Sequence, residues 1–218
     1  MATALIAGAS GLVGGLLLRR LLDAPEYDRV VSVGRRRLDL EHPKLVQIIT
    51  DFAALERLPE PLRGDDAFCC LGSTIRQAGS RAAFRAVDQA AVLAFAWSAQ
   101  RGGARSFAVV SSLGADAKSR VFYNRVKGET EDALRVLGFD TLGIFRPSLL
   151  LGRHPPSRFG EKIAAALLAF SRPLLVGGWR KYRAIEAEVV ARAMVRSAKR
   201  AAGGARVCES DEIQRLGE

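Results

Sequence analysis

The sequence predicts an α/β protein built on a doubly wound parallel sheet, and three observations carry this prediction. Short β-type runs alternate with longer helical patterns from the first residues onward. Most of these runs are apolar throughout, as strands are when helices cover both faces of a parallel sheet. The chain of 218 residues, 49% of them hydrophobic, is long enough to bury the core of one large domain. We therefore expect a single domain over residues 1–218, with right-handed crossovers between its strands.

The predicted elements alternate regularly up to residue 145. The strands are Thr3–Ala7, Val30–Val33, Lys44–Thr50, Ala67–Leu71, Ser106–Ser111 and Thr141–Phe145. The helices are Gly11–Asp23, a short one after Asp51, Ser80–Arg101 and Ser119–Leu137. In the third helix apolar residues recur three and four positions apart. The glycine pair 102–103 that follows this helix is a typical helix end.

The alternation weakens after Phe145. A segment rich in Pro, Gly and Arg is followed by helical patterns at Glu161–Phe170 and near Ile185–Arg200. We expect residues 147–183 to form a small C-terminal substrate-side lobe, with the second of these helices returning to the sheet. A short final strand is predicted near Gly203–Arg206.

The strong positive charge raises the question of a nucleic-acid partner. The formal net charge is +10 and the pI about 10.2. The basic residues are spread along the chain, and the aromatic residues do not alternate with them as a base-stacking strip requires. We therefore rank nucleic-acid binding last among the candidate functions, because a phosphate-bearing cofactor or substrate is a more economical use of the charge.

The cysteines and the apolar stretches suggest a compartment. The three cysteines include the vicinal pair Cys69 and Cys70, whose side chains would point to opposite faces of a strand, and no CxxC pattern is present. With only two histidines, no metal site is predicted. No export signal and no apolar stretch long enough to span a bilayer is recognisable, so we expect a cytoplasmic protein with no membrane association.

A glycine-rich loop between the first strand and the first helix predicts a phosphate site. Gly8, Gly11 and Gly14 form a GxxGxxG pattern. The first glycine permits the tight turn, the second lets the backbone approach a pyrophosphate, and the third lets the helix pack closely. The amide groups of Ser10, Gly11, Leu12 and Val13, at the positive end of the helix, would bind the diphosphate of a dinucleotide. A glycine-rich turn that merely joins strand and helix is the alternative.

The end of the second strand favours NADP (NADPH) over NAD. NAD sites usually place an acidic residue here to bind the ribose hydroxyls, whereas a basic residue accommodates the 2′-phosphate of NADP. The sequence has no acid here and continues Arg35-Arg36-Arg37. The guanidinium of Arg35 can bind phosphate through two parallel hydrogen bonds, and Arg36 or Arg37 adds positive charge. A solvated charged turn is the alternative.

A tyrosine and a lysine one helical turn apart predict an acid/base pair. Tyr123 and Lys127 share a helix face after the fifth strand. An ammonium group nearby eases proton transfer by the phenol of Tyr123, and Lys127 can also hydrogen-bond the ribose of a nicotinamide. Ser111 and Ser112 end the fifth strand, where ligands of such sheets bind. Ser112, or failing it Ser111, would hydrogen-bond the reacting carbonyl.

Together these motifs resemble the atypical short-chain dehydrogenase/reductases with an NAD(P)-binding Rossmann fold. Within them the chain is most similar to bacterial relatives of the human Tat-interacting oxidoreductase-like protein, a family of NADPH-binding proteins. The segments that carry the resemblance are Gly8–Gly14, 33–36, 51–52, 68–74, 87–88, 111–116, 123–129 and 145–147. The 68–74 and 111–116 segments are the more specific of these.

The resemblance implies further contacts with the dinucleotide. Asp51 and Phe52 would lie at the adenine, and Pro147 beside the nicotinamide. Cys70, Leu71 and Gly72 would line the dinucleotide, although core packing remains the better reading for at least one of the two adjacent cysteines. Two departures from the broader family are a lobe shorter than that of sugar-nucleotide epimerases and a tighter spacing between Ser112 and Tyr123.

Two functions remain open beside nucleic-acid binding. The first is an oxidoreductase that transfers hydride between NADP(H) and a carbonyl or alcohol, with Ser112, Tyr123 and Lys127 as catalytic residues. The second is an NADPH-binding regulatory or redox-sensing protein without turnover. A small-molecule substrate is expected in either case. Basic side chains in the lobe point to an anionic substrate, with ordinary surface charge as an equally good explanation: Arg153, His154, Arg158, Arg180, Lys181 and Arg183. The sequence also leaves open a homodimer through the helices Ser80–Arg101 and Ser119–Leu137.

Overall fold

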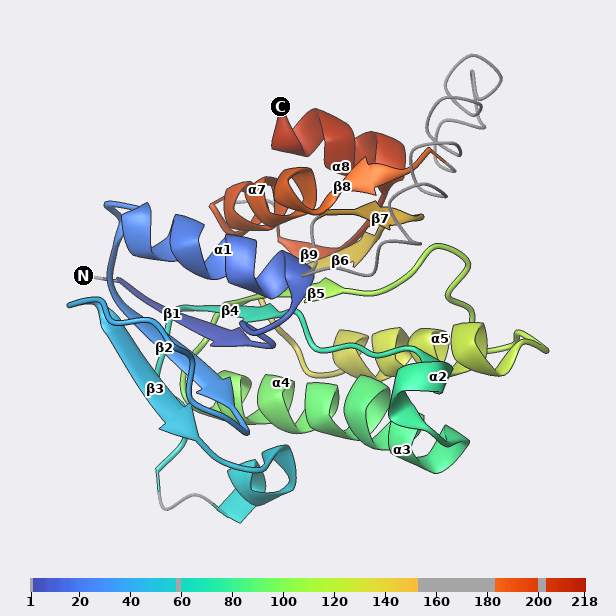
Figure 1. Ribbon diagram of the computed structural model, residues 1–218, viewed down its shortest axis with the longest axis horizontal. Helices are drawn as coiled ribbons and strands as arrows, with labels where there is room; N and C mark the ends of the chain where they lie inside the picture. The colour runs from blue at the N-terminus through green and yellow to red at the C-terminus, as the bar shows by residue number, and fades with distance from the viewer. Residues whose placement is uncertain (1, 58–59, 153–182, 200–202) are drawn as a thin grey trace.

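The computed structural model describes residues 2–57, 60–152, 183–199 and 203–218. Its centre is a parallel seven-stranded sheet in the order β3-β2-β1-β4-β5-β6-β9 (Figure 1). The strands are β1 Ala2–Ala7, β2 Tyr27–Gly34, β3 Leu45–Ile49, β4 Asp66–Cys69, β5 Ser106–Val110, β6 Thr141–Arg146 and β9 Gly204–Glu209. The order reverses between β1 and β4, which is the switch point at which ligands bind in such sheets. The predicted α/β fold with a doubly wound parallel sheet is confirmed.

Helices cover both faces of this sheet (Figure 1). One face carries α1 Leu12–Asp23, α7 Ala187–Ala198 and α8 Ser210–Gly217. The other carries α4 Val92–Arg101 and α5 Phe122–Arg135, together with the short helices α2 Ile75–Ala78 and α3 Arg81–Arg85 and the 3₁₀ segment Phe52–Arg57. Because neighbouring strand residues point to opposite faces, Ala4 and Ile6 enter the core beneath α1 while Leu5 enters the core beneath α4. This is why the buried stretches of the central strands are apolar on both faces.

The predicted helix Ser80–Arg101 is continuous but not regular. It begins as α3, where the hydroxyl of Ser80 accepts a hydrogen bond from the amide of Ala83 at 3.0 Å. It then passes through a π-helical segment, Ala86–Ala91, before continuing as α4. The wide turn places Asp88 on the face that packs against α5, where it is 1% exposed. Such turns are frequent at functional sites.

Several predicted boundaries are wrong for local reasons. The helix α5 begins at Phe122 rather than Ser119, because Asp116 and Ser119 instead form turns by accepting hydrogen bonds from amides further along the chain. The fourth strand ends at Cys69 rather than Leu71. The helices α2 and α8 were not predicted, and β9 runs on to Glu209.

Only the two ends of the predicted lobe lie within the described residues. Within the lobe, β7 Leu150–Leu151 pairs in parallel with β8 Ile185–Glu186, which lies just beyond the lobe where the sequence predicted the start of a helix. The remaining predictions for the lobe, including the helix Glu161–Phe170 and the basic residues 153–181, fall outside the described residues. Among the described helices, none is long and apolar enough to cross a membrane.

Candidate functional site

The glycine-rich loop packs against the end of β4. Gly8 follows β1 with a φ of +84°, a conformation that glycine adopts without strain. A Cβ at Gly8 would lie 2.6 Å from the carbonyl oxygen of Cys70. A Cβ at Gly14 would lie 2.7 Å from the carbonyl carbon of Gly8, and closer still to its oxygen. Neither position can take a side chain while the loop keeps this shape.

The amides at the start of α1 differ in one respect from the prediction. The amide of Gly11 donates a hydrogen bond to the carbonyl of Gly8 at 3.0 Å, so it is not free for a ligand as we expected. Leu12 and Val13 occupy the first turn of α1, where amide groups have no partner within the helix. Ser10 and Gly11 are exposed, whereas the side chain of Val13 is buried in the core. The backbone amides of residues 10–13 can therefore form an anion site, except for the amide of Gly11, which is already hydrogen-bonded to Gly8.

The ends of β2 and β3 lie at the same edge of the sheet. Arg35 and Arg36 directly follow β2 and are exposed, and Val33 of β2 pairs with Ala7 at the end of β1. The guanidinium groups of Arg35 and Arg36 can therefore approach a ligand that is bound at the glycine-rich loop. Asp51 is exposed and its Oδ1 accepts a hydrogen bond from Ala53 at 3.2 Å. Phe52 is only 5% exposed, so its ring belongs to the core rather than to an open surface.

The chain leaving β4 forms the opposite wall of the loop. The amide of Cys70 donates to the carbonyl of Ala7 at 2.8 Å, and Gly72 is exposed. Burial raises the pKa of the Cys69 thiol to about 12. Burial, followed by the neighbouring Cys69, raises the pKa of the half-buried Cys70 well above its usual value. Both thiols are therefore protonated at neutral pH and, like Cys208, they are free.

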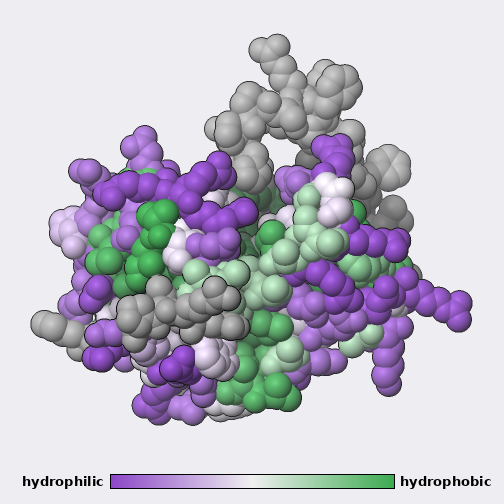
Figure 2. Space-filling view, turned by 90° about the horizontal axis from the view of Figure 1, so that it is seen from below, coloured by the Kyte–Doolittle hydropathy of each residue, from purple (hydrophilic) through white to green (hydrophobic). Residues whose placement is uncertain are grey.

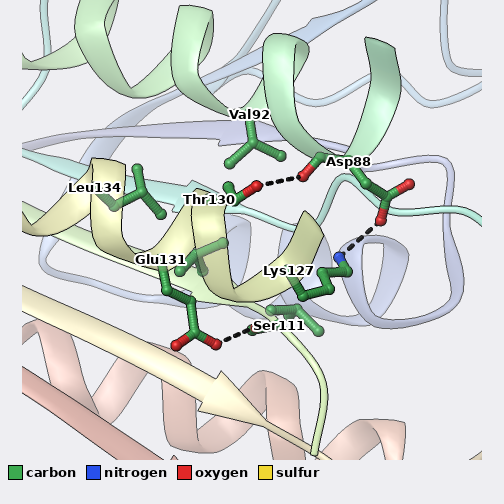
Figure 3. A pocket seen from close by; sticks show the side chains of 9 residues that line it. Asp88, Val92, Ser111, Lys127, Thr130, Glu131 and Leu134 are labelled. Carbon is green, nitrogen blue, oxygen red and sulfur yellow. Dashed lines mark hydrogen bonds and ion pairs between the residues drawn. The ribbon is translucent and has the colours of Figure 1, made fainter. Parts of the chain in front are cut away.

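The two serines after β5 have different environments. Ser111 is buried, and its hydroxyl donates to Oε1 of Glu131 on α5 at 2.5 Å (Figure 3). Glu131 also binds Arg146 at the end of β6 through two nitrogens, at 2.9 and 2.5 Å. Ser112 is half-buried at the edge of the sheet, next to a backbone hydrogen bond of 3.1 Å between Leu113 and Pro147. Of the two serines, Ser112 therefore lies where a ligand can reach it, and the Ser111 hydroxyl is already engaged.

Tyr123 and Lys127 lie on the same face of α5, as predicted. Tyr123 is half-buried, with its ring centre 5.3 Å from that of Phe84. Lys127 is 5% exposed, and its Nζ lies 2.7 Å from Oδ1 of Asp88 (Figure 3). Oδ2 of Asp88 accepts hydrogen bonds from the amide and the hydroxyl of Ser73, at 2.9 and 2.7 Å. The lysine thus has a buried carboxylate partner that the sequence interpretation did not assign.

A small cavity lies between α4, α5 and β5, next to this ion pair (Figure 3). Its apolar side is formed by valine and leucine, and its polar side joins the Lys127 pair to the Glu131 cluster. The lining residues are Asp88, Val92, Val109, Val110, Ser111, Lys127, Thr130, Glu131 and Leu134. Within the ranges that the structure describes, no three His, Cys, Asp or Glu side chains come together as a metal site would require.

A recognisable signal pointed to the two missed carboxylates. Asp88 lies four residues after Phe84 and seven before Phe95, which puts it on the apolar face of its helix. Glu131 occupies the corresponding place on α5, four residues after Lys127. A charged residue on a buried face requires a partner. The same periodicity that predicted the helices could therefore have singled out both residues.

Comparisons with known proteins show which family the chain belongs to. No family model matches the chain. Protein HTATIP2 of Rattus norvegicus is 36% identical over 218 residues, covering 98% of this chain and 88% of the relative. A protein of Aspergillus clavatus named "fmp52, mitochondrial" is 31% identical over 217 residues, covering 94% and 90%.

Solved structures share the fold at lower identity. The enzyme WbmH of Bordetella bronchiseptica, in complex with NAD⁺, superposes with a TM-score of 0.71 at 18% identity, covering 100% of this chain and 79% of that one. The human epimerase family protein SDR39U1 with NADPH gives a TM-score of 0.66 at 16% identity, covering 95% and 74%. Since more than a third of its residues match HTATIP2 over most of both chains, the protein belongs to the HTATIP2 family of atypical short-chain dehydrogenase/reductases.

Proposed function

We propose that the protein is an oxidoreductase that binds NADP(H) and transfers hydride between it and a carbonyl or alcohol. The observation that carries the proposal is the meeting of two features at one edge of the sheet. The glycine-rich loop between β1 and α1 lies at the switch point, and Tyr123 and Lys127 lie on α5, the helix that follows β5, which is two strands away from β1. The relatives that are solved with NAD⁺ or NADPH have the same fold.

The residues at the loop fit a dinucleotide. The close approach of Gly14 to Gly8 and of Gly8 to Cys70 keeps side chains away from the start of α1, so a pyrophosphate can reach its amides. The exposed Arg35 and Arg36 can bind a 2′-phosphate, and β2 ends in Gly34 without an acid that would prefer free ribose hydroxyls. These features support NADP rather than NAD.

The chain's own residues can manage the proton that accompanies hydride transfer. The nicotinamide supplies or accepts the hydride when it is bound. The phenol of Tyr123 would donate a proton to the substrate oxygen during reduction, or take one during oxidation. Ser112 would hydrogen-bond the same oxygen, and the ammonium of Lys127 would hydrogen-bond the ribose of the nicotinamide. Pro147, held by Leu113, would border the nicotinamide ring.

A second function, regulation through bound NADPH without turnover, has one observation in its favour. The carboxylate of Asp88 lies 2.7 Å from the Lys127 ammonium and offsets its charge, which reduces the help that Lys127 gives to Tyr123. The two protonated thiols of Cys69 and Cys70, at the end of β4, argue against cysteine as the sensing group in this function. Bound cofactor itself would then be the signal.

The variants Arg35→Asp and Tyr123→Phe test the proposal. In the parent protein we expect NADPH to bind at least about tenfold more tightly than NADH, and Arg35→Asp to reverse or abolish the preference. Tyr123→Phe should keep NADPH binding and lose turnover across a panel of aldehydes and ketones. A parent that prefers NADH would refute the NADP assignment. A parent that binds NADPH and turns over nothing would favour the regulatory function.

Location, partners and oligomeric state stay predictions. We propose a reducing compartment such as the cytoplasm, although the fungal relatives are named mitochondrial proteins. A homodimer through α4 and α5 would cover Trp97, which is exposed. The face that carries α3 and α4 would form part of such an interface, and on it apolar areas are scattered among hydrophilic ones (Figure 2). Sedimentation of the purified protein would decide between monomer and dimer. An anionic small-molecule substrate remains a proposal as well.

A further inference from the structure

Asp88 joins three parts of the structure through its side chain and backbone. Its carboxylate, with a fully buried side chain, pairs with Lys127 on α5 and accepts two hydrogen bonds from Ser73 in the loop after β4. Its backbone carbonyl accepts a hydrogen bond from the hydroxyl of Thr130 at 3.2 Å (Figure 3). We call Ser73, Asp88, Lys127 and Thr130 the Asp88 network.

The π-helical segment explains how Asp88 can serve these partners together. In a regular α-helix a carbonyl is occupied by the amide four residues later. The wide turn over Ala86–Ala91 changes this pattern, and the carbonyl of Asp88 turns to Thr130 of the neighbouring helix. The single hydroxyl proton of Thr130 is shared between this carbonyl and the carbonyl of Val126 on its own helix, which lies closer, at 2.8 Å. The position of the Asp88 carboxylate is therefore set from both sides.

The Asp88 network lies directly beneath the backbone of Gly72. A Cβ at Gly72 would lie 3.5 Å from Oδ1 of Asp88 and 3.6 Å from Nζ of Lys127. Gly72 itself is exposed, and it follows β4, on the far side of the switch point from β2 and Arg35. In a sheet of this order the adenosine half of a dinucleotide lies toward β2 and the nicotinamide half toward β4 and β5. The network is therefore placed under the nicotinamide half.

We propose that Asp88 is a positioning residue for the nicotinamide ribose, an inference that rests on the proposed function. Asp88 uses one of the three donors of the Lys127 ammonium and leaves the others for ribose hydroxyls. Its two hydrogen bonds with Ser73 also fix the backbone of Gly72 and Ser73, which lies next to the Lys127 ammonium. A buried ion pair contributes little net stability, but it holds its partners in one geometry. The network thereby prepares the site before the cofactor arrives.

Two ligands separate this role from a general effect on folding. NADPH carries both halves of the dinucleotide, whereas adenosine 2′,5′-bisphosphate carries only the half that Arg35 would bind. For Asp88→Asn we expect NADPH to bind at least about tenfold more weakly and the bisphosphate to bind within about twofold of the parent. Both affinities are measured by calorimetry on the full-length protein.

Ser73→Ala keeps the ion pair between Asp88 and Lys127 and removes one of the two hydrogen bonds that Ser73 donates to Asp88. This variant tests the positioning role of Asp88 even if Asp88→Asn does not fold. We expect it to weaken NADPH about threefold to tenfold without changing bisphosphate binding. Thr74→Ala is the matched control, because Thr74 caps α2 next door and has no bond to Asp88. It should bind both ligands as the parent does.

Unchanged NADPH affinity in the variants, or an equal loss for both ligands, would overturn the positioning role. A parent protein that binds the bisphosphate and NADPH with equal affinity would overturn it as well, since the nicotinamide half then contributes nothing. A parent that binds neither ligand would overturn the proposed function, and the inference with it.

Discussion

The contrast between two adjacent glycines in α1 gives a sharp test of the loop geometry. A Cβ at Gly14 would lie 2.7 Å from the carbonyl carbon of Gly8 and 3.0 Å from the Cα of Ala9, both backbone atoms that cannot rotate away. A Cβ at Gly15 would meet only the oxygen of Ala9, at 3.4 Å, which is ordinary contact. Gly14→Ala therefore has to displace α1 or the loop, whereas Gly15→Ala does not.

The expected stability change follows from these distances. Normal contact requires Gly14→Ala to move backbone by about 1 Å, within a helix whose Leu17 and Leu21 are fully buried. Overpacking of this kind costs about 3 kcal/mol, and the better helix propensity of alanine returns about 1 kcal/mol. The net loss is about 2 kcal/mol, while Gly15→Ala should gain up to about 1 kcal/mol.

Urea unfolding and thermal unfolding, followed by circular dichroism, measure both variants. The difference of about 3 kcal/mol between them corresponds to melting temperatures that are about 6–12 °C apart in a protein of this size. Equal stability of the two variants would refute the reasoning, because it would mean that Gly14 has room that the loop geometry denies it.

Three further predictions concern the loop, the buried polar cluster and the thiols. Gly11→Ala should melt within a few degrees of the parent protein. It should bind NADPH at least about tenfold more weakly, because the added methyl group would occupy the space that a pyrophosphate needs. Equal NADPH affinity of variant and parent by calorimetry would contradict this. Glu131→Ala leaves Arg146 without its buried partner and should lower the free energy of unfolding by about 3 kcal/mol. Ser111→Ala should lower it by only about 1 kcal/mol. Losses of about 1 kcal/mol in both variants would show that Ser111, Glu131 and Arg146 are not electrostatically coupled. Burial raises the pKa of the Cys69 thiol from about 9 to about 12, so the contribution of this thiol to the free energy of unfolding is complete below pH 9 and is lost as pH rises toward 12. Alkylation of Cys69 in the native protein at about pH 8 should therefore be slow, and rapid labelling of Cys69 would argue against its burial.

The parts of the fold that the sequence predicted are those with a strong repeating pattern. The central strands are recognisable because both of their faces are buried, so apolar residues run without interruption. The helix α8 buries only Ile213 and Leu216 among its large side chains, too few positions to set a period. The helix α2 has just four residues, but its capping box of Thr74 and Gln77 was visible in the sequence.

At the site, residue types were predictable and side-chain directions were not. The motifs predicted Tyr123 and Lys127 on one helix face, but the partner of Lys127 lies on another helix, distorted by a π turn that no local pattern announces. Ser111 could have been placed once the faces of β5 were known. It lies two residues after Val109, which belongs to the core beneath α4, and it therefore turns toward α5 rather than toward a ligand.

The most direct test of the account is a calorimetric titration of the purified, ligand-free protein with NADPH and with NADH. The account predicts a saturable heat with both dinucleotides and tighter binding of NADPH. The absence of saturable heat with either one would contradict the claim that the amides at the start of α1 bind a diphosphate.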